Sequence, residues 1–337
     1  MLSSANVRSS NRPVRKIVGG LSFVLIACGI AEGALRFIPG VNFYLKENSL
    51  HCAASFYLKL CPSRSIEFKN SAGKTYTVTT NEAGERITSA MRDTSRDQDS
   101  QTNRPELWLI GDSIAMGHGL TDSDTAAWIA QSRLKSWKIR NLATDSVGPL
   151  AMTDILKQTP GKPAQIIWIF NPSDFIDDPL ETARRESFSR RAIFLLKYYV
   201  KSSAIASAAR VFAGSADTSY VQGGSAPLAD AADPIFAHIL DLSKEADHRG
   251  ARFCILLYSD VEAGTNKPEK ENRLRFMIAD LAMAHHICTI DVRDQFQSSK
   301  ENLYLENGPP GPAASRIFAD AIVNSVSGQE PRAKSER

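Results

Sequence analysis

The sequence predicts an α/β fold in which one parallel sheet lies between two layers of helices. Two observations support this. From residue 104 to 327, short apolar segments typical of buried strands alternate with longer segments typical of helices. Strands that alternate with helices imply parallel pairing, because each crossover between parallel neighbours needs a helix. A chain of 337 residues is also long enough to bury the core of such a three-layer domain.

The expected elements follow one another in a regular order. The expected strands are 107–110, 137–142, 165–170, 252–258 and 287–291. The expected helices are 124–135, 150–158, 234–248, 269–286 and 313–325. In open parallel sheets a ligand binds at the carboxyl ends of the strands, so the site is expected there. Residues 328–337 are expected to form a disordered tail.

Residues 179–232 form an insertion in this alternation. Its first part, 181–212, is expected to be helical and places basic residues among aromatic and aliphatic ones. These basic residues are Arg184, Arg185, Arg190, Arg191, Lys197 and Lys201. Its second part, 213–232, is rich in Gly, Ala and Ser and is expected to be a flexible loop. Two interpretations of the basic helix remain open: a solvated face over a core stripe, or a lid or surface that touches anionic lipid or glycan.

The N-terminus predicts attachment to a membrane. Residues 1–16 form a basic tail, expected in the cytoplasm, with Arg8, Arg12, Arg15 and Lys16. The apolar segment 17–38 is expected to be a membrane anchor, since about twenty residues suffice to cross a bilayer. The basic flank then places the bulk of the chain outside the cytoplasm, in the periplasm of a bacterium. Three alternatives remain: a cleaved signal peptide, a buried helix, and a lipoprotein at Cys28, because residues 25–28 resemble a lipobox.

Residues 39–103 are expected to form a linker that contains a β-hairpin. The alternating segments 65–68 and 75–80 flank the turn signal at 70–73. Residues 39–65 are expected to be irregular, and residues 94–103 are polar and expected to be mobile. Cys52 and Cys61 lie in this region, where an oxidising compartment would permit a disulfide.

Composition and cysteine spacing narrow the function classes. The net charge of +3 is small and the basic residues are spread along the chain, so no nucleic-acid partner is expected. No Cys or His spacing typical of a structural metal site occurs, and no cofactor is expected. Cys254 and Cys288 lie in expected strands and are interpreted as small buried hydrophobic residues.

The strongest motif is Gly111-Asp112-Ser113, directly after the first expected strand of the domain. Gly117 and Gly119 follow before the next helix. A serine at the end of a strand and the start of a helix projects into the cleft, and its own backbone N–H can help stabilise an oxyanion. Ser113 is therefore the candidate nucleophile. Asp112 is expected to orient the loop, and Gly117 to allow close approach of a substrate.

With this motif the sequence resembles the SGNH (GDSL-type) hydrolase superfamily, in particular its membrane-anchored bacterial branch. The basic and apolar start with Glu32 and Arg36, the turn at 81–84 and the strand before Ser113 carry the resemblance. The resemblance implies a flavodoxin-like sheet. It also implies an ester hydrolase or acyltransferase that acts on an acylated carbohydrate or lipid.

Two further blocks of the family are altered in this chain. The second block keeps Asn141, but Ser146 stands at the oxyanion-hole glycine, and Gly148 could replace it only if the loop shifts. The third block has Ser173 in the asparagine position and Asn171 two residues earlier. The resemblance makes Ser173 and Asn171 the candidate oxyanion donors, although a serine hydroxyl reaches less far than an amide.

The last block departs most. Asn307 stands at the position of the family's aspartate and Pro309 at that of its histidine. Proline cannot accept a proton, so serine attack loses most of its activation. Glu306 is a nearby carboxylate that could orient a ligand. Among the six histidines, His118 is within the motif, and it is expected to be an exposed loop residue.

Three functional hypotheses follow: an enzyme, a binding domain and a structural scaffold. The first is an esterase or acyltransferase with Ser113 as nucleophile. The second is a catalytically inactive domain that binds an acylated glycan or a protein partner in envelope assembly. The third is a membrane-tethered scaffold without a pocket.

Overall fold

The computed structural model describes residues 12–69, 73–90, 104–212, 232–259, 268–305 and 309–327. The chain forms two compact units. Unit 1 comprises Met1–Ser49 and Leu196–Ser219, and unit 2 comprises Leu50–Leu195 and Tyr220–Arg337. Unit 2 therefore begins more than fifty residues before the predicted domain start at 104.

Unit 2 is built on a five-stranded parallel sheet, as predicted. Its strands are β5 (Glu106–Gly111), β6 (Lys138–Asn141), β7 (Pro163–Ile169), β8 (Arg252–Leu257) and β9 (Cys288–Asp291). Their order is β6-β5-β7-β8-β9, with every neighbouring pair parallel. This is the flavodoxin-like order, in which the chain direction across the sheet reverses between the first and third strands. Here the point of reversal lies at the carboxyl ends of β5 and β7.

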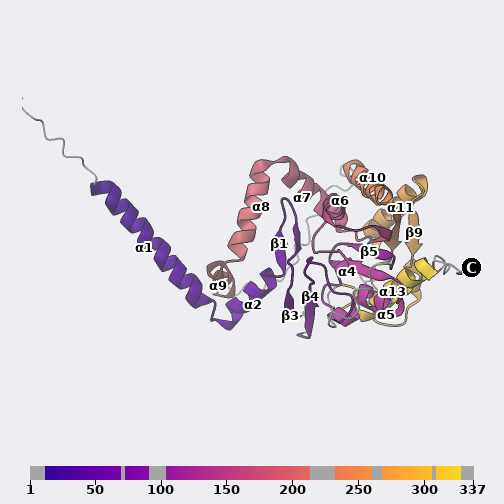
Figure 1. Cartoon of the computed structure of the whole chain (residues 1–337), viewed down its shortest axis with the longest axis horizontal. Helices are drawn as coiled ribbons and strands as arrows, with labels where there is room; N and C mark the ends of the chain where they lie inside the picture. The colour runs from indigo at the N-terminus through magenta and orange to yellow at the C-terminus, as the bar shows by residue number, and fades with distance from the viewer. Residues whose placement is uncertain are drawn as a thin grey trace, which may run out of the picture. The chain divides into compact units, whose positions relative to one another are not determined.

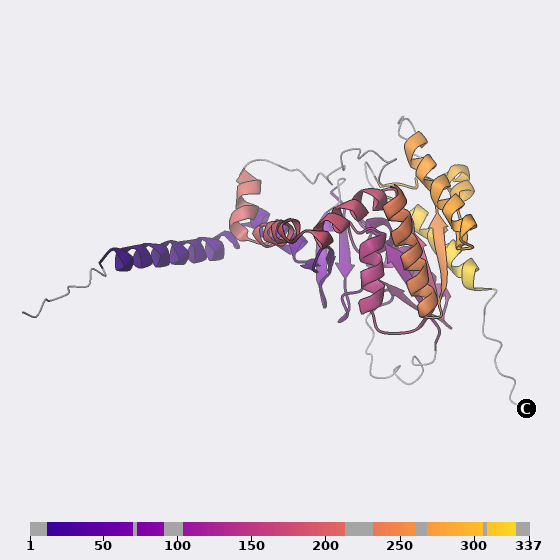
Figure 2. The same ribbon diagram turned by 90° about the horizontal axis from the view of Figure 1, so that it is seen from above.

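Helices cover both faces of this sheet, so the predicted three-layer arrangement is confirmed (Figures 1 and 2). One face packs on α4 (Ser113–Met116), α5 (Ala126–Arg133), α12 (Arg293–Ser298) and α13 (Pro312–Ser327). The other packs on α6 (Pro149–Gln158), α7 (Asp174–Glu186), α10 (Ala232–His248) and α11 (Pro268–Ala284). A short 3-10 helix, η1 (Asp122–Asp124), precedes α5.

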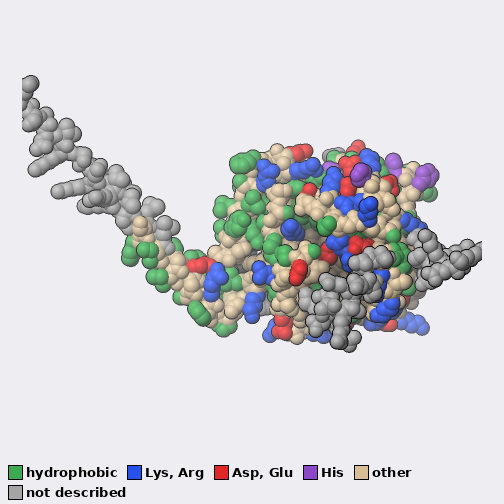
Figure 3. Space-filling view, in the orientation of Figure 1, with side chains coloured by type: hydrophobic (Ala, Val, Ile, Leu, Met, Phe, Trp, Pro, Cys, Tyr) green, Lys and Arg blue, Asp and Glu red, His purple; other side chains and the backbone are tan. Residues whose placement is uncertain are grey.

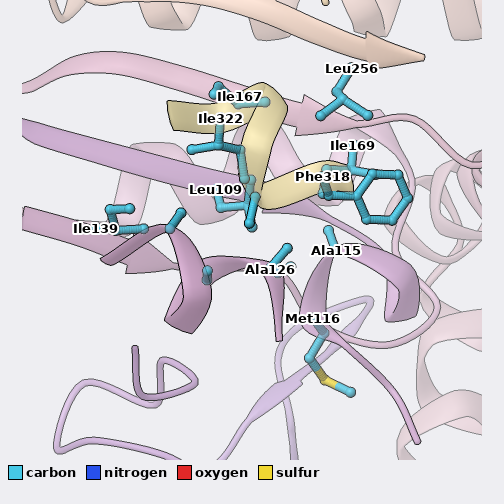
Figure 4. Close-up of a cluster of buried hydrophobic side chains, with 14 of the residues drawn as sticks. Leu109, Ala115, Met116, Ala126, Ile139, Ile167, Ile169, Leu256, Phe318 and Ile322 are labelled. Carbon is cyan, nitrogen blue, oxygen red and sulfur yellow. The ribbon is translucent and has the colours of Figure 1, made fainter. Parts of the chain in front are cut away.

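The three central strands, β5, β7 and β8, are apolar almost throughout because both of their faces are buried. Successive side chains of a strand point to opposite faces. In β5, Leu107 and Leu109 therefore enter the core on the α13 side, and Trp108 and Ile110 enter the core on the α6 side. Figure 4 shows the first of these cores, where strand residues such as Leu109 face the helix α13.

Two β-hairpins in unit 2 pack onto the same cores. The predicted hairpin is confirmed as β3 (Ser65–Lys69) with β4 (Thr75–Thr79), and Phe68 and Tyr76 join the α13-side core. The irregular structure expected over 39–65 is wrong. Those residues form the helix α2 (Pro39–Asn48) and a hairpin of β1 (His51–Ala53) and β2 (Leu58–Leu60). A disulfide between Cys52 and Cys61 closes the hairpin, and Tyr57 at its tip is buried.

Cys254 and Cys288 are not merely small buried residues, as the sequence analysis expected. They form a disulfide between β8 and β9. The parallel register sets these two residues side by side, with 4.4 Å between their Cα atoms. Their separation of 34 residues gives no sequence signal for this pairing.

Unit 1 is helical. It contains α1 (Arg12–Leu35), α2, the end of α8 (Phe188–Lys201) and α9 (Ala204–Phe212). The helical segment expected over 181–212 is therefore three helices, α7, α8 and α9, with breaks at Ser187 and at 202–203. The predicted anchor segment is helical, but no helix of the described residues has an apolar stretch long enough to cross a membrane.

Candidate functional site

The segment around Ser113 forms a strand, a tight turn and a helix, as the motif predicts. β5 ends at Gly111, Asp112 caps the N-terminus of α4, and Ser113 is the first residue of that helix. Gly111 has φ +142°, and a Cβ there would lie 2.6 Å from the Ala115 Cβ. Only glycine fits this turn. Ser113 is 5% exposed, and its Oγ accepts or donates no hydrogen bond among the described residues.

The α4 helix ends one turn later at Gly117. This residue has φ +88°, and its N–H donates to the carbonyl oxygens of Ser113 and Ile114. The His118 N–H donates to the Ser113 carbonyl oxygen at 2.8 Å. These bonds form a Schellman-type ending and fix the loop that follows the candidate nucleophile.

The carboxylate of Asp112 organises the centre of the site. Its Oδ1 accepts a hydrogen bond from the Ile114 N–H at 2.9 Å. Its Oδ2 accepts one from Asn171 Nδ2 at 2.6 Å and one from Ser173 Oγ at 2.6 Å. Burial raises the pKa of Asp112, and these donors offset part of that rise. Asp112 therefore joins the start of α4 to the residues that follow β7.

The two candidate oxyanion donors, Asn171 and Ser173, are brought together, but their hydrogens are engaged. Asn171 Nδ2 also donates to Ser173 Oγ at 2.7 Å. An amide has two N–H hydrogens and a hydroxyl has one. Both Asn171 hydrogens and the Ser173 hydrogen thus point within this cluster.

Side chains from neighbouring strands fix the cluster further. Tyr258, after β8, donates from its hydroxyl to Asn171 Oδ1 at 3.2 Å. Asp174 Oδ2 accepts from Trp168 Nε1 at 3.1 Å and from the Asn171 N–H at 3.1 Å. Burial, with the nearby Asp112 charge, raises the pKa of Asp174 well above its usual range. The site is thus assembled at the carboxyl ends of β5, β7 and β8.

The loop after β6 supplies the second block. The Thr144 N–H donates to the Gly111 carbonyl at 3.2 Å, which places the loop beside the Ser113 turn. Asn141 is fully buried, and its Nδ2 donates to the Ala115 carbonyl at 3.3 Å. This bond ties the end of β6 to α4.

Within this loop Ser146 and Gly148 differ in backbone conformation and in the use of their N–H groups. Ser146 has φ +55°, so it holds the left-handed conformation that glycine adopts without strain. The Gly148 N–H donates to Glu181 Oε1 at 2.9 Å, and a Cβ on Gly148 would lie 2.7 Å from the Asp178 Cβ. Gly148 is thus the N-cap residue of α6, and its N–H is already bonded to Glu181 of α7, whereas Ser146 holds a left-handed backbone conformation.

Asp145 of the same loop is paired with two imidazoles from other segments. Asp145 Oδ2 is 2.7 Å from His51 Nε2, and Asp145 Oδ1 is 3.4 Å from His118 Nδ1. Burial acts to raise the pKa of Asp145, but His118 and His51 outweigh it and hold that pKa far below its usual range. His118, expected to be a plain loop residue, is therefore paired with a buried carboxylate. His51 was not singled out from the sequence.

Arg86 is a second residue that the sequence analysis did not assign to the site. Its buried guanidinium donates to the carbonyl oxygens of Met116 at 3.0 Å, Gly117 at 2.6 Å and Leu120 at 2.5 Å. Its Nε also donates to Asp122 Oδ1 at 3.1 Å. Arg86 thereby clamps the loop after α4. The sequence places Arg86 at the end of the turn at 81–86, but it gives no sign of the carbonyl groups to which Arg86 donates.

The last family block is described in part. Asn307 and Glu306 lie outside the described residues. Pro309 lies close to the loop after α4, since a Cβ on Gly119 would be 3.7 Å from Pro309 Cγ. The proline therefore stands beside the Ser113 segment and offers no proton acceptor there. Across the described ranges, no three His, Cys, Asp or Glu side chains are arranged to hold a metal ion.

Comparisons with known proteins give structural likenesses only. No family model and no curated protein matches the sequence. A G-D-S-L family lipolytic protein of Veillonella parvula is 12% identical, with a TM-score of 0.44, over 67% of this chain and 99% of its own. A putative G-D-S-L family lipolytic protein of Desulfitobacterium hafniense is 13% identical, with a TM-score of 0.42, over 66% and 99%. The acetyl xylan esterase AlAXEase is 12% identical, with a TM-score of 0.43, over 66% and 99%. Likenesses at this level carry no argument about activity.

Proposed function

We propose that this chain is an SGNH-type ester hydrolase or acyltransferase that uses Ser113 on an acylated carbohydrate or lipid outside the cytoplasm. The observation that carries the proposal is the position of Ser113. It begins a helix at the carboxyl end of β5, where the strand order of the sheet reverses between β5 and β7, and the loop around it is held by Asp112.

In the proposed reaction Ser113 Oγ attacks the carbonyl carbon of the ester. A bond forms between Oγ and that carbon, the ester C–O bond breaks, and the alcohol leaves with a proton. Water then attacks the acyl carbon in hydrolysis, or a second hydroxyl group attacks it in acyl transfer. The bond from that carbon to Oγ breaks, and Ser113 regains a proton from the attacking group. Both outcomes use the same first step, so Ser113 is required for either.

The proton acceptor in this proposal is His118. The family's histidine is replaced by Pro309, whereas His118 follows α4 directly and is paired with Asp145. A carboxylate on Nδ1 orients an imidazole and stabilises its protonated form, which is the role of the aspartate in catalytic triads. The proton would pass from Ser113 Oγ to this imidazole directly or through a water molecule.

Backbone N–H groups are the proposed oxyanion donors. Asn171 and Ser173 already donate to Asp112. In contrast, the N–H groups of Ser113 and Ser146 donate to no other residue of the described ranges. Two such donors suffice to stabilise the tetrahedral oxyanion.

Two features support the proposed location outside the cytoplasm. The Cys52–Cys61 and Cys254–Cys288 disulfides form and persist in oxidising compartments. The basic N-terminal segment followed by apolar residues is typical of segments that direct a chain to a membrane for export.

A fluorophosphonate probe tests the assignment. We expect the full-length protein to be labelled at Ser113 and to cleave p-nitrophenyl acyl esters. The Ser113→Ala variant should lose both properties while it keeps its circular dichroism spectrum. Ser315→Ala, which alters another buried serine of unit 2, should keep both.

A catalytically inactive domain is the second candidate, favoured by Pro309 at the histidine position. That domain would bind an acylated glycan or an envelope protein at the same carboxyl end of the sheet. Absence of probe labelling at every pH, together with ligand binding that Ser113→Ala leaves unchanged, would support it over the enzyme.

A further inference from the structure

Exposed hydrophobic side chains are concentrated in unit 1. Of the fourteen large hydrophobic side chains that are exposed among the described residues, nine belong to this small unit. They are Phe23, Ile26, Ile30, Phe37, Leu196, Tyr199, Val200, Ile205 and Phe212. In Figure 3 hydrophobic side chains gather over α1 and over α8. Concentrated exposed apolar surface of this kind marks an interaction site.

The exposed residues come from two distant segments that fold as one body. Glu32 of α1 caps the N-terminus of α9: its Oε1 accepts from the Ala204 N–H at 2.6 Å and its Oε2 from the Ile205 N–H at 3.1 Å. Arg36 donates to Glu32 Oε1 at 3.0 Å. Glu32, a charged residue in an apolar segment, thus joins the N-terminal helix to the insertion.

A small core completes this joint. Val41 of α2 packs with Ala204 and Ala208 of α9, and all three are buried. Asn48 Nδ2 also donates to the Lys201 carbonyl at 2.7 Å. The apolar residues of the insertion are therefore held in the same body as those that precede residue 49.

The two units have opposite charge. The sequence of unit 1 contains nine basic and three acidic residues, a net charge of +6. The sequence of unit 2 contains 31 basic and 34 acidic residues, a net charge of −3. Among the described residues of unit 1, Arg36, Lys46, Lys197 and Lys201 are exposed.

We propose that unit 1 lies on the surface of a lipid bilayer and recognises anionic lipid. Exposed aromatic and aliphatic side chains beside lysine and arginine are the composition of interfacial helices. Each basic residue near an anionic surface adds to the affinity. A protein partner or a second copy of the chain would bury apolar surface equally well, but neither is singled out by an excess of positive charge. The proposal does not depend on the activity of Ser113.

The test reads the local environment of unit 1 in the full-length chain. In a Cys28→Ser background, an environment-sensitive fluorophore is attached to Leu196→Cys or to Phe212→Cys. Met283→Cys on α11 is the matched control, since Met283 is 73% exposed and Phe212 is 76% exposed. Vesicles of phosphatidylcholine with or without phosphatidylglycerol are then added.

We expect a blue shift at 196 and 212, but not at 283, with vesicles that contain phosphatidylglycerol. Lys197→Gln with Lys201→Gln should lower the affinity for these vesicles, measured by titration of the blue shift, about 25-fold. Each lysine accounts for about fivefold. Lys157→Gln with Lys244→Gln, which removes two exposed lysines of unit 2, should leave it unchanged.

Two results would overturn the proposal. In the first, the labels at 196 and 212 remain water-like although the protein floats with the vesicles. In the second, the shift occurs without lipid and grows with protein concentration, which would assign the surface to a second copy of the chain.

Discussion

Ser173 Oγ donates a hydrogen bond of 2.6 Å to Asp112 Oδ2. The bond joins the residue that follows β7 to the residue that precedes the candidate nucleophile. It gives Ser173 a positioning role in place of the oxyanion contact that the family resemblance implies. Asn171 donates to the same oxygen, so both side chains hold Asp112 and, through it, the start of α4.

Removal of the Ser173 hydroxyl should therefore affect stability more than chemistry. We expect Ser173→Ala to lower the free energy of unfolding by about 1–2 kcal/mol, because a buried carboxylate loses one of three donors. The specificity constant kcat/KM should fall by less than about tenfold, since the proposed oxyanion donors, the N–H groups of Ser113 and Ser146, stay in place. Urea unfolding and ester hydrolysis measure the two effects.

Ser132→Ala, on the exposed side of α5, is the control for this variant. A loss of more than about a hundredfold in kcat at unchanged stability would show that Ser173 donates to the oxyanion.

The pairing of His118 with Asp145 predicts a specific loss of activity. Both His118→Gln and Asp145→Asn should reduce kcat by about 10²–10⁴-fold, because the proton acceptor or its orienting carboxylate is lost. Stopped-flow ester hydrolysis checks this.

His238 provides a matched control because its Nδ1 lies 2.7 Å from Asp178 Oδ2 within the same unit. His238→Gln also disrupts an imidazole–carboxylate pair, yet we expect kcat to stay within about twofold of wild type. Equal losses for His118→Gln and His238→Gln would assign both pairs to stability alone.

The sequence was informative where burial leaves a local pattern. Residues 107–110 are apolar without alternation because Leu109 and Trp108 face different cores, and this run predicted a parallel strand. The turn signal at 70–73, between the alternating segments 65–68 and 75–80, predicted the β3–β4 hairpin. The order strand, Ser113 and helix also follows from neighbouring residues, so the start of the site was predicted well.

Features that join distant segments were not predictable in this way. The register that pairs Cys254 with Cys288 is set by the packing of two crossovers. Arg86 lies in a turn that the sequence marks, but the carbonyl groups that it binds are some thirty residues away. His51 meets Asp145 only because the β1–β2 hairpin, with strands of three residues, is closed by a disulfide. Each case needs tertiary structure to become visible.

The left-handed backbone of Ser146 predicts a stabilising substitution. A non-glycine residue at φ +55° costs about 1 kcal/mol relative to glycine. Ser146→Gly should thus raise the free energy of unfolding by about that amount and keep at least wild-type activity, if the Ser146 N–H is an oxyanion donor. Urea unfolding and ester hydrolysis test both parts.

Ser63, at φ +53° outside the site, is the matched control: Ser63→Gly should stabilise the protein similarly and leave kcat unchanged. Ser146→Pro, which forbids a positive φ and removes the N–H, should abolish activity. Full activity in Ser146→Pro would exclude this residue from the oxyanion hole.

Asp177, in the first turn of α7, predicts a pH dependence of stability. Burial, followed by the nearby charge of Asp112, raises the pKa of Asp177 to about 7, from an ordinary value of 3.8. Between these two values the folded state binds more protons than the unfolded state. The free energy of unfolding therefore falls as pH rises from about 4 to 7 on account of this group.

Asp177→Asn removes the charge and should stabilise the protein by about 1–2 kcal/mol at pH 8, after allowance for solvent screening, and by little at pH 4. Urea unfolding at both pH values measures the difference. Asp241→Asn, on an exposed face of α10, is the control, and an Asp177→Asn variant no more stable than wild type at pH 8 would contradict the prediction.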